Sequence, residues 1–328
     1  MAYAINSIFT GGLCAIRMLC MDENIVFAKQ NEKDSIDKLM AVRRLYSNAK
    51  FINKVNFIFS VIIPVILSLV KVFISKCDFV FNQSFVPYLG YYGIAVLVFT
   101  VMTNGIVSDL KKKAAKIQEM FDCDVLSIKW NDVKLGKKIN SLNILKASRY
   151  YRKRKKEPVF KNWYFDKEYA FNKNISTLLC QNENIGWDLS QRIILNRLIM
   201  ITLVFSGSFL LGFCFYYDMK VSEFLFYIVF LLPFFRHFYL LFKDNNSTID
   251  RCSRVNENID KTIELCISGD EKDNLSLDYT IRTIQDEIYT HRVSSQPVPD
   301  IIHKIFRSRN EEQFKQHFEY YLDKMKNP

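Results

Sequence analysis

Four long apolar runs, arranged in two pairs around a basic stretch, constrain this chain more than any other feature of its sequence. They lie at Phe57–Ile74, Tyr88–Val107, Leu198–Tyr217 and Phe224–Phe242. A helix needs about 20 mainly apolar residues to cross a hydrocarbon core about 30 Å thick. Because helices satisfy their own backbone polar groups in lipid, such runs indicate spanning helices. We predict a mainly α, polytopic membrane protein with four transmembrane helices in two hairpins and a mostly helical cytoplasmic domain.

The distribution of charge predicts how the four spans are oriented. The 328 residues carry a formal net charge of +11. Lys and Arg gather before the first pair of runs, between the two pairs and after the second pair, whereas the short connections within each pair hold few. Cytoplasmic loops retain Lys and Arg. We therefore expect both termini and the central stretch to face the cytoplasm.

The apolar runs and the charged stretches divide the chain into six segments. We expect a non-native N-terminal extension, an amphipathic helix, a first hairpin, a central domain, a second hairpin and a helical tail, at residues 1–20, 21–56, 57–107, 108–197, 198–242 and 243–328. The first segment lacks the features of a signal peptide, because its single charge, Arg17, follows the apolar part. Our hypothesis is that Met21 is the true start, which an intact-mass measurement of the native protein tests.

Local patterns within the polar segments predict further elements. Apolar residues recur at helical spacing from Ser35 to Lys54. The stretch Val125–Trp130 alternates β-branched and polar residues and predicts a short strand. Asn131 or Asp132 is expected to cap the next helix, and Asn310 to cap a last helix with acidic residues in its first turn.

Motifs of the common enzyme classes are missing from the sequence. It contains no Walker A loop, no GxGxxG, no GxSxG, no HExxH and no protein-kinase set. The eight cysteines form no CxxC pair and the four histidines are far apart, so no zinc motif is present. We therefore predict a protein that is not an enzyme and that needs no metal or cofactor. No zinc finger or RNA-binding motif accompanies the positive charge, so no direct contact with DNA or RNA is expected.

Five strings from the polar segments stand out, and they occur in a fixed order relative to the four apolar runs. They are QNEKDSIDKLMAVRRLYSNAK, FDCDVLSIKWND, NWYFDK, LLCQNENIGWD and IRTIQDEIYTHRVSSQPVPDIIHKIFR. In sequence and in order they resemble those of the SMODS-associating four-transmembrane effector family of bacterial defence systems, and the likeness extends from Met21 to about Glu312.

The resemblance implies a function that composition and periodicity alone do not. Such effectors are encoded beside a nucleotidyltransferase that makes a cyclic di- or oligonucleotide during phage infection. The nucleotide is expected to bind the effector, which then oligomerises and disrupts or permeabilises the bacterial inner membrane, causing abortive infection. The partners implied are the cyclic nucleotide, the lipid bilayer and further copies of the chain.

The resemblance carries no established ligand residues, so the candidate contacts rest on chemistry. Phosphates attract cations, and bases stack on aromatic rings and pair with polar side chains. Arg43, Arg44, Arg282 and Arg292 are predicted to hold phosphate. Trp130, Trp163, Tyr164 and Tyr289 are predicted to stack on bases. Asp124, Asn131, Asp132 and Asp286 are predicted to read base edges or orient the arginines. Because Arg282 and Asp286 are four residues apart, an ordinary helical ion pair is the alternative.

Three other functions stay open at this stage. A constitutive channel or small transporter would carry more polar residues along its spans, and it would conduct without a ligand. A membrane enzyme would need a paired acid and base or a metal constellation. A membrane anchor would recruit a partner through the helical tail. A nucleotidyltransferase gene beside this one would favour the effector over all three.

Overall fold

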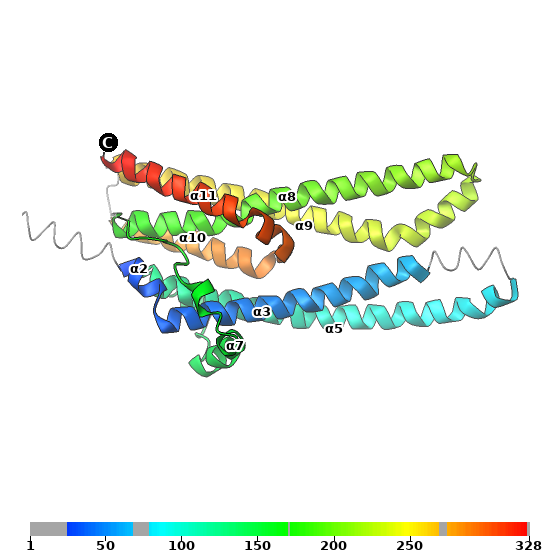
Figure 1. Cartoon of the computed structure of the whole chain (residues 1–328), viewed down its shortest axis with the longest axis horizontal. Helices are drawn as coiled ribbons and strands as arrows, with labels where there is room; N and C mark the ends of the chain where they lie inside the picture. The colour runs from blue at the N-terminus through cyan, green and yellow to red at the C-terminus, as the bar shows by residue number, and fades with distance from the viewer. Residues whose placement is uncertain (1–24, 68–78, 170, 269–273, 327–328) are drawn as a thin grey trace, which may run out of the picture.

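The computed structural model describes residues 25–67, 79–169, 171–268 and 274–326, and its regular structure in these ranges is helical throughout (Figure 1). The predicted mainly α fold is confirmed. Residues 1–24, with Met21, lie outside the described residues, and so do residues 68–78, which hold the end of the first apolar run and the start of the connection to the second; α5 begins within that connection, at Phe79. The elements are α2 (Ile25–Gln30), α3 (Lys33–Phe57), the π-helical turn η1 (Ile58–Ile62), α5 (Phe79–Val125), α6 (Asp132–Leu135), α7 (Ser141–Lys153), the 3₁₀ turn η2 (Glu157–Phe160), α8 (Lys173–Tyr216), α9 (Val221–Ser268), α10 (Asn274–Ser294) and α11 (Asp300–Lys326).

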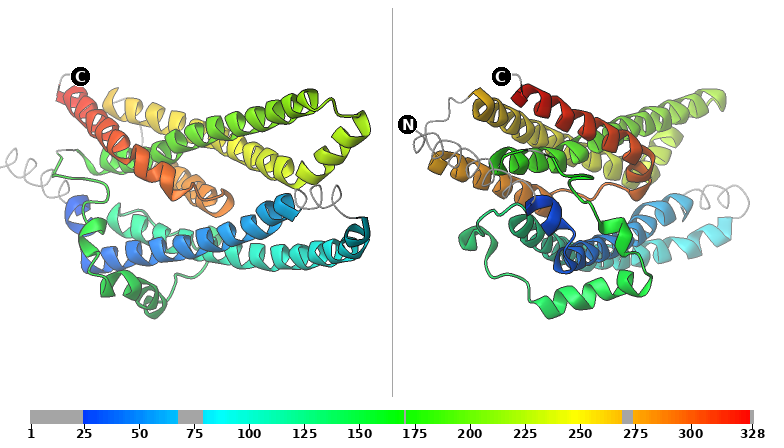
Figure 2. Two further views of the ribbon diagram at one scale, coloured as in Figure 1. Left: turned by 45° about the vertical axis from the view of Figure 1, so that its right-hand side comes forward. Right: turned by 60° about the vertical axis from the view of Figure 1, so that its left-hand side comes forward.

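Two long helical hairpins organise the molecule. Helix α3 and its continuation pack along α5, and α8 packs along α9, so that both hairpins point the same way (Figures 1 and 2). Three helical stretches are long and apolar enough to cross a membrane: Lys33–Leu67, Tyr91–Val125 and Lys173–Tyr216. In the most apolar 18 residues of each stretch, at most 11% of the residues are buried inside the protein. Side chains this apolar and this exposed need lipid around them, so the chain is a membrane protein.

The fourth apolar run lies within α9, and its role as a span stays a prediction. Each of the four runs is continuous with a polar helical segment, because α3, α5, α8 and α9 pass through the predicted segment boundaries without a break. The helix that carries the first run is wider at η1, just before Pro64. Proline lacks an N–H and its ring crowds the carbonyl four residues earlier, which explains the wider turn at this place.

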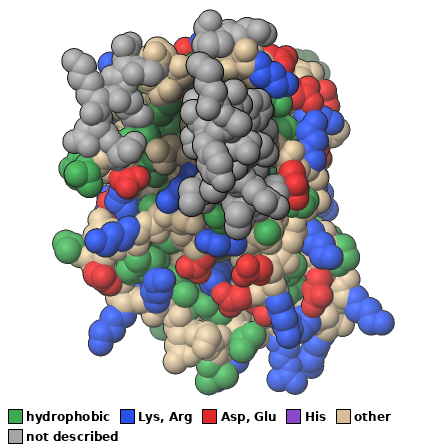
Figure 3. All heavy atoms as spheres, turned by 90° about the vertical axis from the view of Figure 1, so that its left-hand side faces the viewer, with side chains coloured by type: hydrophobic (Ala, Val, Ile, Leu, Met, Phe, Trp, Pro, Cys, Tyr) green, Lys and Arg blue, Asp and Glu red, His purple; other side chains and the backbone are tan. Residues whose placement is uncertain are grey.

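The polar halves of the hairpins form the body of the molecule with the remaining helices. Its core is aromatic and aliphatic, and the largest side chains with almost no exposure include Phe121, Phe165, Phe171, Leu178 and Ile259. Helix α10 contacts α5 of the first hairpin and both α8 and α9 of the second. It therefore joins the two hairpins, which also contact each other directly where α9 meets the end of α3 and η1. Figure 3 shows the end of the body remote from the hairpin tips, where Lys and Arg alternate with Asp and Glu.

Two local predictions are wrong. Val125–Trp130 is not a strand, because Val125 ends α5 and a turn with Ser127 at φ 55° follows. Asn310 does not cap a helix, because α11 begins ten residues earlier, at Asp300 after Pro299. The Asn310 side chain is instead buried and donates a hydrogen bond to Ser190 Oγ at 3.0 Å.

The predicted cap at Asn131 is confirmed, but the helix it begins is short. Its side-chain oxygen accepts from the Lys134 amide at 3.2 Å. Gly136, at φ 63°, then ends α6 in a conformation that residues with a Cβ rarely adopt. A new helix, α7, starts at Ser141 with Asn140 as its cap.

Two leucines of α8 test which part of this helix is packed in the body and which part faces lipid. Leu179 is fully buried and Leu211 is 50% exposed. We expect Leu179→Ala to lower the free energy of unfolding in detergent by about 2–5 kcal/mol, because it leaves a cavity. Leu211→Ala should change it by less than about 0.5 kcal/mol. Thermal unfolding of the two variants compares them, and equal losses would contradict the lipid-facing position of Leu211.

Candidate functional site

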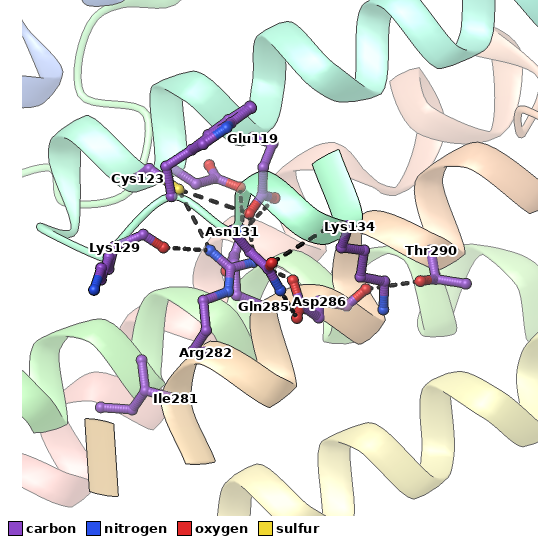
Figure 4. Close-up of polar contacts among 12 residues, drawn as sticks. Glu119, Cys123, Lys129, Asn131, Lys134, Ile281, Arg282, Gln285, Asp286 and Thr290 are labelled. Atoms are coloured by element: carbon purple, nitrogen blue, oxygen red, sulfur yellow. Dashed lines mark hydrogen bonds and ion pairs between the residues drawn. The ribbon is translucent and has the colours of Figure 1, made fainter. Parts of the chain in front are cut away.

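Buried charges of α5 and α10 meet at the junction of the two hairpins (Figure 4). Glu119 and Asp122 lie one turn apart on α5, and both are fully buried. Arg282 donates to Glu119 Oε1 at 2.7 Å, and Arg292 donates to Asp122 Oδ2 at 2.5 Å. Between them, Gln285 Nε2 lies 2.9 Å from both Glu119 Oε2 and Asp122 Oδ2. We call these five residues the coupling cluster.

Helix α8 is tied to the coupling cluster through amide and hydroxyl groups. Gln181 Nε2 donates to Gln285 Oε1 and to the Ile281 carbonyl, each at 3.0 Å. The Tyr164 hydroxyl donates to Asp122 Oδ1 at 2.5 Å and accepts from Asn184 Nδ2 at 2.7 Å. Both hairpins and α10 therefore share one hydrogen-bonded network.

Arg282 and Asp286 extend the network to the turn that follows α5. Arg282 donates to the Lys129 carbonyl at 3.1 Å and to Asp286 Oδ1 at 2.7 Å. Asn131 Nδ2 donates to Asp286 Oδ2 at 2.8 Å, as Figure 4 shows. The predicted helical ion pair of Arg282 and Asp286 is present, and it is the outer part of a larger arrangement.

Burial controls the acid–base properties of the coupling cluster. Burial and the adjacent charge of Asp122 raise the pKa of Glu119, although Arg292 and Arg282 oppose the rise. Burial alone would lower the pKa of Arg292, but Asp122, Tyr164 and Glu119 outweigh it and the pKa is raised. Burial and Glu119 raise the pKa of the Cys123 thiol to about 12. Arg292 therefore stays charged, and the Cys123 thiol stays protonated.

The structure brings five of the predicted contact residues into one network and places the others elsewhere. The five are Asn131, Tyr164, Arg282, Asp286 and Arg292. Arg43 lies on α3, where Nη2 is 3.4 Å from Asp300 Oδ1. Arg44 lies over the ring of Tyr150, 3.9 Å from its centroid.

The remaining predicted contacts are dispersed over the body. Asp124 accepts from Lys38 Nζ at 2.7 Å, and Asp132 is exposed in the first turn of α6. The Trp130 indole donates to the Gly136 carbonyl at 3.0 Å. Trp163 is 39% exposed, and Tyr289 is partly buried on α10.

Sequence reasoning missed Glu119, Asp122 and Gln285. A signal for them exists, because Arg282, Gln285 and Arg292 recur at spacings that place them on one face of a helix. A helix face with two arginines inside a buried core requires carboxylates opposite it. What the sequence does not give is which of the 34 acidic residues supply them.

The two cavities that stand out in the described part of the molecule are small. One, of about 230 Å³, lies between α8 and α11 and is lined by Asn182, Ser190 and Phe314 among others. The other, of about 280 Å³, lies between α2, α3 and the end of α5, beside Lys29, Lys38 and Asp124. Ligand pockets commonly measure about 300–1,000 Å³. A nucleotide with several bases therefore needs more room than either cavity offers.

Fold and site together define a helical membrane protein in which a helical body couples two long hairpins. Residues 24–320 match the family described as the SMODS-associating 4TM effector domain, and the chain belongs to this family. The description of the family is that of an effector domain.

One curated protein illustrates the relationship. A probable CBASS effector molecule from Bacillus cereus (strain VD146) is 24% identical over 289 residues, which cover 87% of this chain and 94% of that protein. No solved structure matches the chain.

Removing Arg292, one of the two cations of the coupling cluster, should strongly destabilise the body. Arg292→Met leaves Asp122 and Glu119 buried without it, and we expect a loss of about 3–5 kcal/mol in the free energy of unfolding. Arg307→Met is the matched control, because Arg307 pairs with Glu311 on the exposed face of α11. It should cost less than about 0.5 kcal/mol. Chemical denaturation in detergent measures both losses. A small loss for Arg292→Met would mean that Arg292 is not the partner of the buried carboxylates Asp122 and Glu119.

The raised pKa of Glu119 predicts a pH dependence with a definite sign. The folded state holds this proton more tightly than the unfolded state, so the group's contribution to stability falls as pH rises above the ordinary pKa of 4.5. Glu119→Gln removes the titration. The stability of the wild type relative to Glu119→Gln should therefore decrease from pH 4.5 upward until Glu119 is ionised. An increase over this range would contradict the assigned direction.

Proposed function

We propose that this chain is an antiphage effector of the bacterial inner membrane that is activated by a cyclic di- or oligonucleotide and permeabilises the membrane. Membership of the effector family and the likeness to a probable CBASS effector support it. The observation that carries the mechanism is the position of α10, which contacts both hairpins and holds the coupling cluster against α5. A ligand that moves α10 or its neighbours changes the orientation of the two hairpins relative to each other.

The ligand phosphates are proposed to bind where α3 meets the start of α11. Lys50 Nζ lies 2.6 Å from Asp300 Oδ1, and Arg43 shares the same oxygen at 3.4 Å. Two cations thus face one carboxylate, and His303 lies close enough to feel all three charges. Burial lowers the pKa of Lys50, and the bond with Asp300 does not fully offset it. An added anion is therefore favoured at this corner.

The arginines of the coupling cluster suit a phosphate less well. Arg282 and Arg292 already pair with buried carboxylates, and a phosphate beside Glu119 and Asp122 would meet their negative charge. We propose that these residues transmit the signal, while Arg43 and Lys50 receive it. Base contacts are proposed for predicted residues that stay exposed, with Trp163 available for stacking and Asp132 for a base edge.

Activation is proposed to proceed through a homo-oligomer. A protomer with two hairpins is too thin to enclose a wide pore, and its small cavities favour a ligand site completed by a neighbouring copy. The ligand, made by the nucleotidyltransferase of the same defence system, must bind the open assembly more tightly than the closed one.

Liposomes that contain the purified chain test the proposal directly. We expect release of an encapsulated dye when one member of a cyclic di- and trinucleotide panel is added. Arg43→Ala combined with Lys50→Ala should raise the ligand concentration for half-maximal release at least tenfold, because two phosphate partners are lost.

Lys54→Ala is the matched control, because Lys54 is an exposed cation on the same helix. It should leave the ligand response unchanged. Dye release without any ligand would favour a constitutive channel, and no release with the whole panel would contradict the proposal. Equal effects of the double and the control variant would exclude the α3–α11 corner as the ligand site.

A further inference from the structure

Three side chains of different chemistry meet in a second buried cluster, where α8, α9 and α10 come together. They are Asp188, Cys252 and His291, and one ligand atom from each lies within 4.8 Å of the other two. His291 Nε2 is 2.7 Å from Asp188 Oδ2, and Cys252 Sγ lies beside the ring, 3.8 Å from Nε2 and 3.6 Å from Nδ1. Cys252 is 1% exposed and His291 6%. A carboxylate, a thiol and an imidazole that converge from three helices form a set of metal ligands.

We propose that Asp188, Cys252 and His291 bind one Zn²⁺ ion that fastens α10 to the second hairpin. Zinc takes Cys sulfur at about 2.3 Å, and His nitrogen and carboxylate oxygen at about 2.0–2.2 Å. Tetrahedral ligands at these lengths lie about 3.4–3.7 Å apart. Cys252 Sγ and His291 Nε2 are already separated by nearly this distance, and a turn of the ring that moves Nδ1 away from the sulfur brings Nε2 to face it. The Asp188 oxygen needs to move about 1 Å from the ring nitrogen, which a side-chain rotation supplies.

The surroundings of the cluster orient its ligands as in a metal site. Ser295 Oγ lies 3.1 Å from His291 Nδ1. A histidine that uses Nε2 for a metal keeps its proton on Nδ1 and donates it to such a partner. Arg192 donates to Asp188, to Asn245 Oδ1 at 3.1 Å and to the Gln296 carbonyl at 2.9 Å. Ser295 therefore holds the ring through Nδ1, and Arg192 holds the carboxylate through Oδ2, the oxygen that also faces His291.

The donor set selects the type of metal. Mg²⁺ and Ca²⁺ prefer several oxygen ligands, and this cluster offers one carboxylate. Sulfur together with imidazole favours zinc. On binding, the Cys252 thiol gives its proton to solvent and the thiolate sulfur bonds to the ion. The negative charges of this thiolate and of Asp188 balance the two charges of the ion, and the nearby Arg192 adds one positive charge. Water completes the fourth position.

The consequence is a fixed contact between α10 and the second hairpin. His291 adjoins Arg292, which belongs to the coupling cluster, so the metal and the ion pairs act on the same turn of α10. Because the ion binds the folded state, it should raise the melting temperature as its concentration increases.

Zinc binding by the full-length chain in detergent tests the proposal. After dialysis against a chelator, titration with Zn²⁺ against a chromophoric competitor should give one ion per chain and a higher melting temperature. Cys252→Ser and His291→Ala should each weaken binding at least tenfold. Cys180→Ser is the matched control, because Cys180 is an equally buried thiol on α8 outside the cluster, and it should bind like the wild type.

X-ray absorption on the wild-type protein loaded with one Zn²⁺ per chain covers the case in which a variant fails to fold. We expect one sulfur at about 2.3 Å and nitrogen or oxygen ligands at about 2.0–2.2 Å. A first shell without sulfur would overturn the proposal. So would wild-type stoichiometry that survives both Cys252→Ser and His291→Ala, since the ion would then lie elsewhere.

Discussion

The burial of two acidic residues of α5 is the constraint on which the rest of the body depends. Glu119 and Asp122 are fully buried, and an ionised carboxylate in such a place is costly unless it is paired and hydrogen-bonded. The guanidinium groups that compensate them come from α10, with Gln285 between. The hairpins therefore do not need extensive direct contact with each other. A third helix holds them, and its register is fixed by charge and not only by apolar packing.

A buried ion-pair network of this kind contributes specificity more than stability. Replacing such a pair by apolar residues is often neutral, whereas breaking it is expensive. The orientation of α10 is thus restricted to arrangements in which both arginines find a carboxylate. An arrangement in between leaves a charge unpaired, and this favours discrete states over gradual deformation. That property suits the ligand-dependent activation that we propose.

The sequence predicts the helical class because the apolar runs have the length of a bilayer and the polar segments keep a helical period. It also points to α10, since the string that contains Arg282, Asp286 and Arg292 supports the family resemblance. The strand at Val125–Trp130 fails because β-branched residues in so short a segment serve a turn equally well. The Asn310 cap fails because asparagine also makes contacts between helices, here with Ser190. Glu119 and Asp122 escape prediction because the partner of a buried cation is chosen by tertiary packing.

The unbroken passage of the long helices from the body into the apolar belt has a mechanical consequence. Helix α8 has 44 residues, which corresponds to about 66 Å of rigid rod at 1.5 Å per residue. If such a rod pivots at its body end by about 5°, its far end moves by about 6 Å, which is close to the pitch of one helical turn. A displacement at the body too small to break a hydrophobic core is thus amplified across the full thickness of a bilayer. A small rotation of a long helix at the body thus becomes a large displacement at its far end, and α10 with its charged residues lies beside the point of rotation.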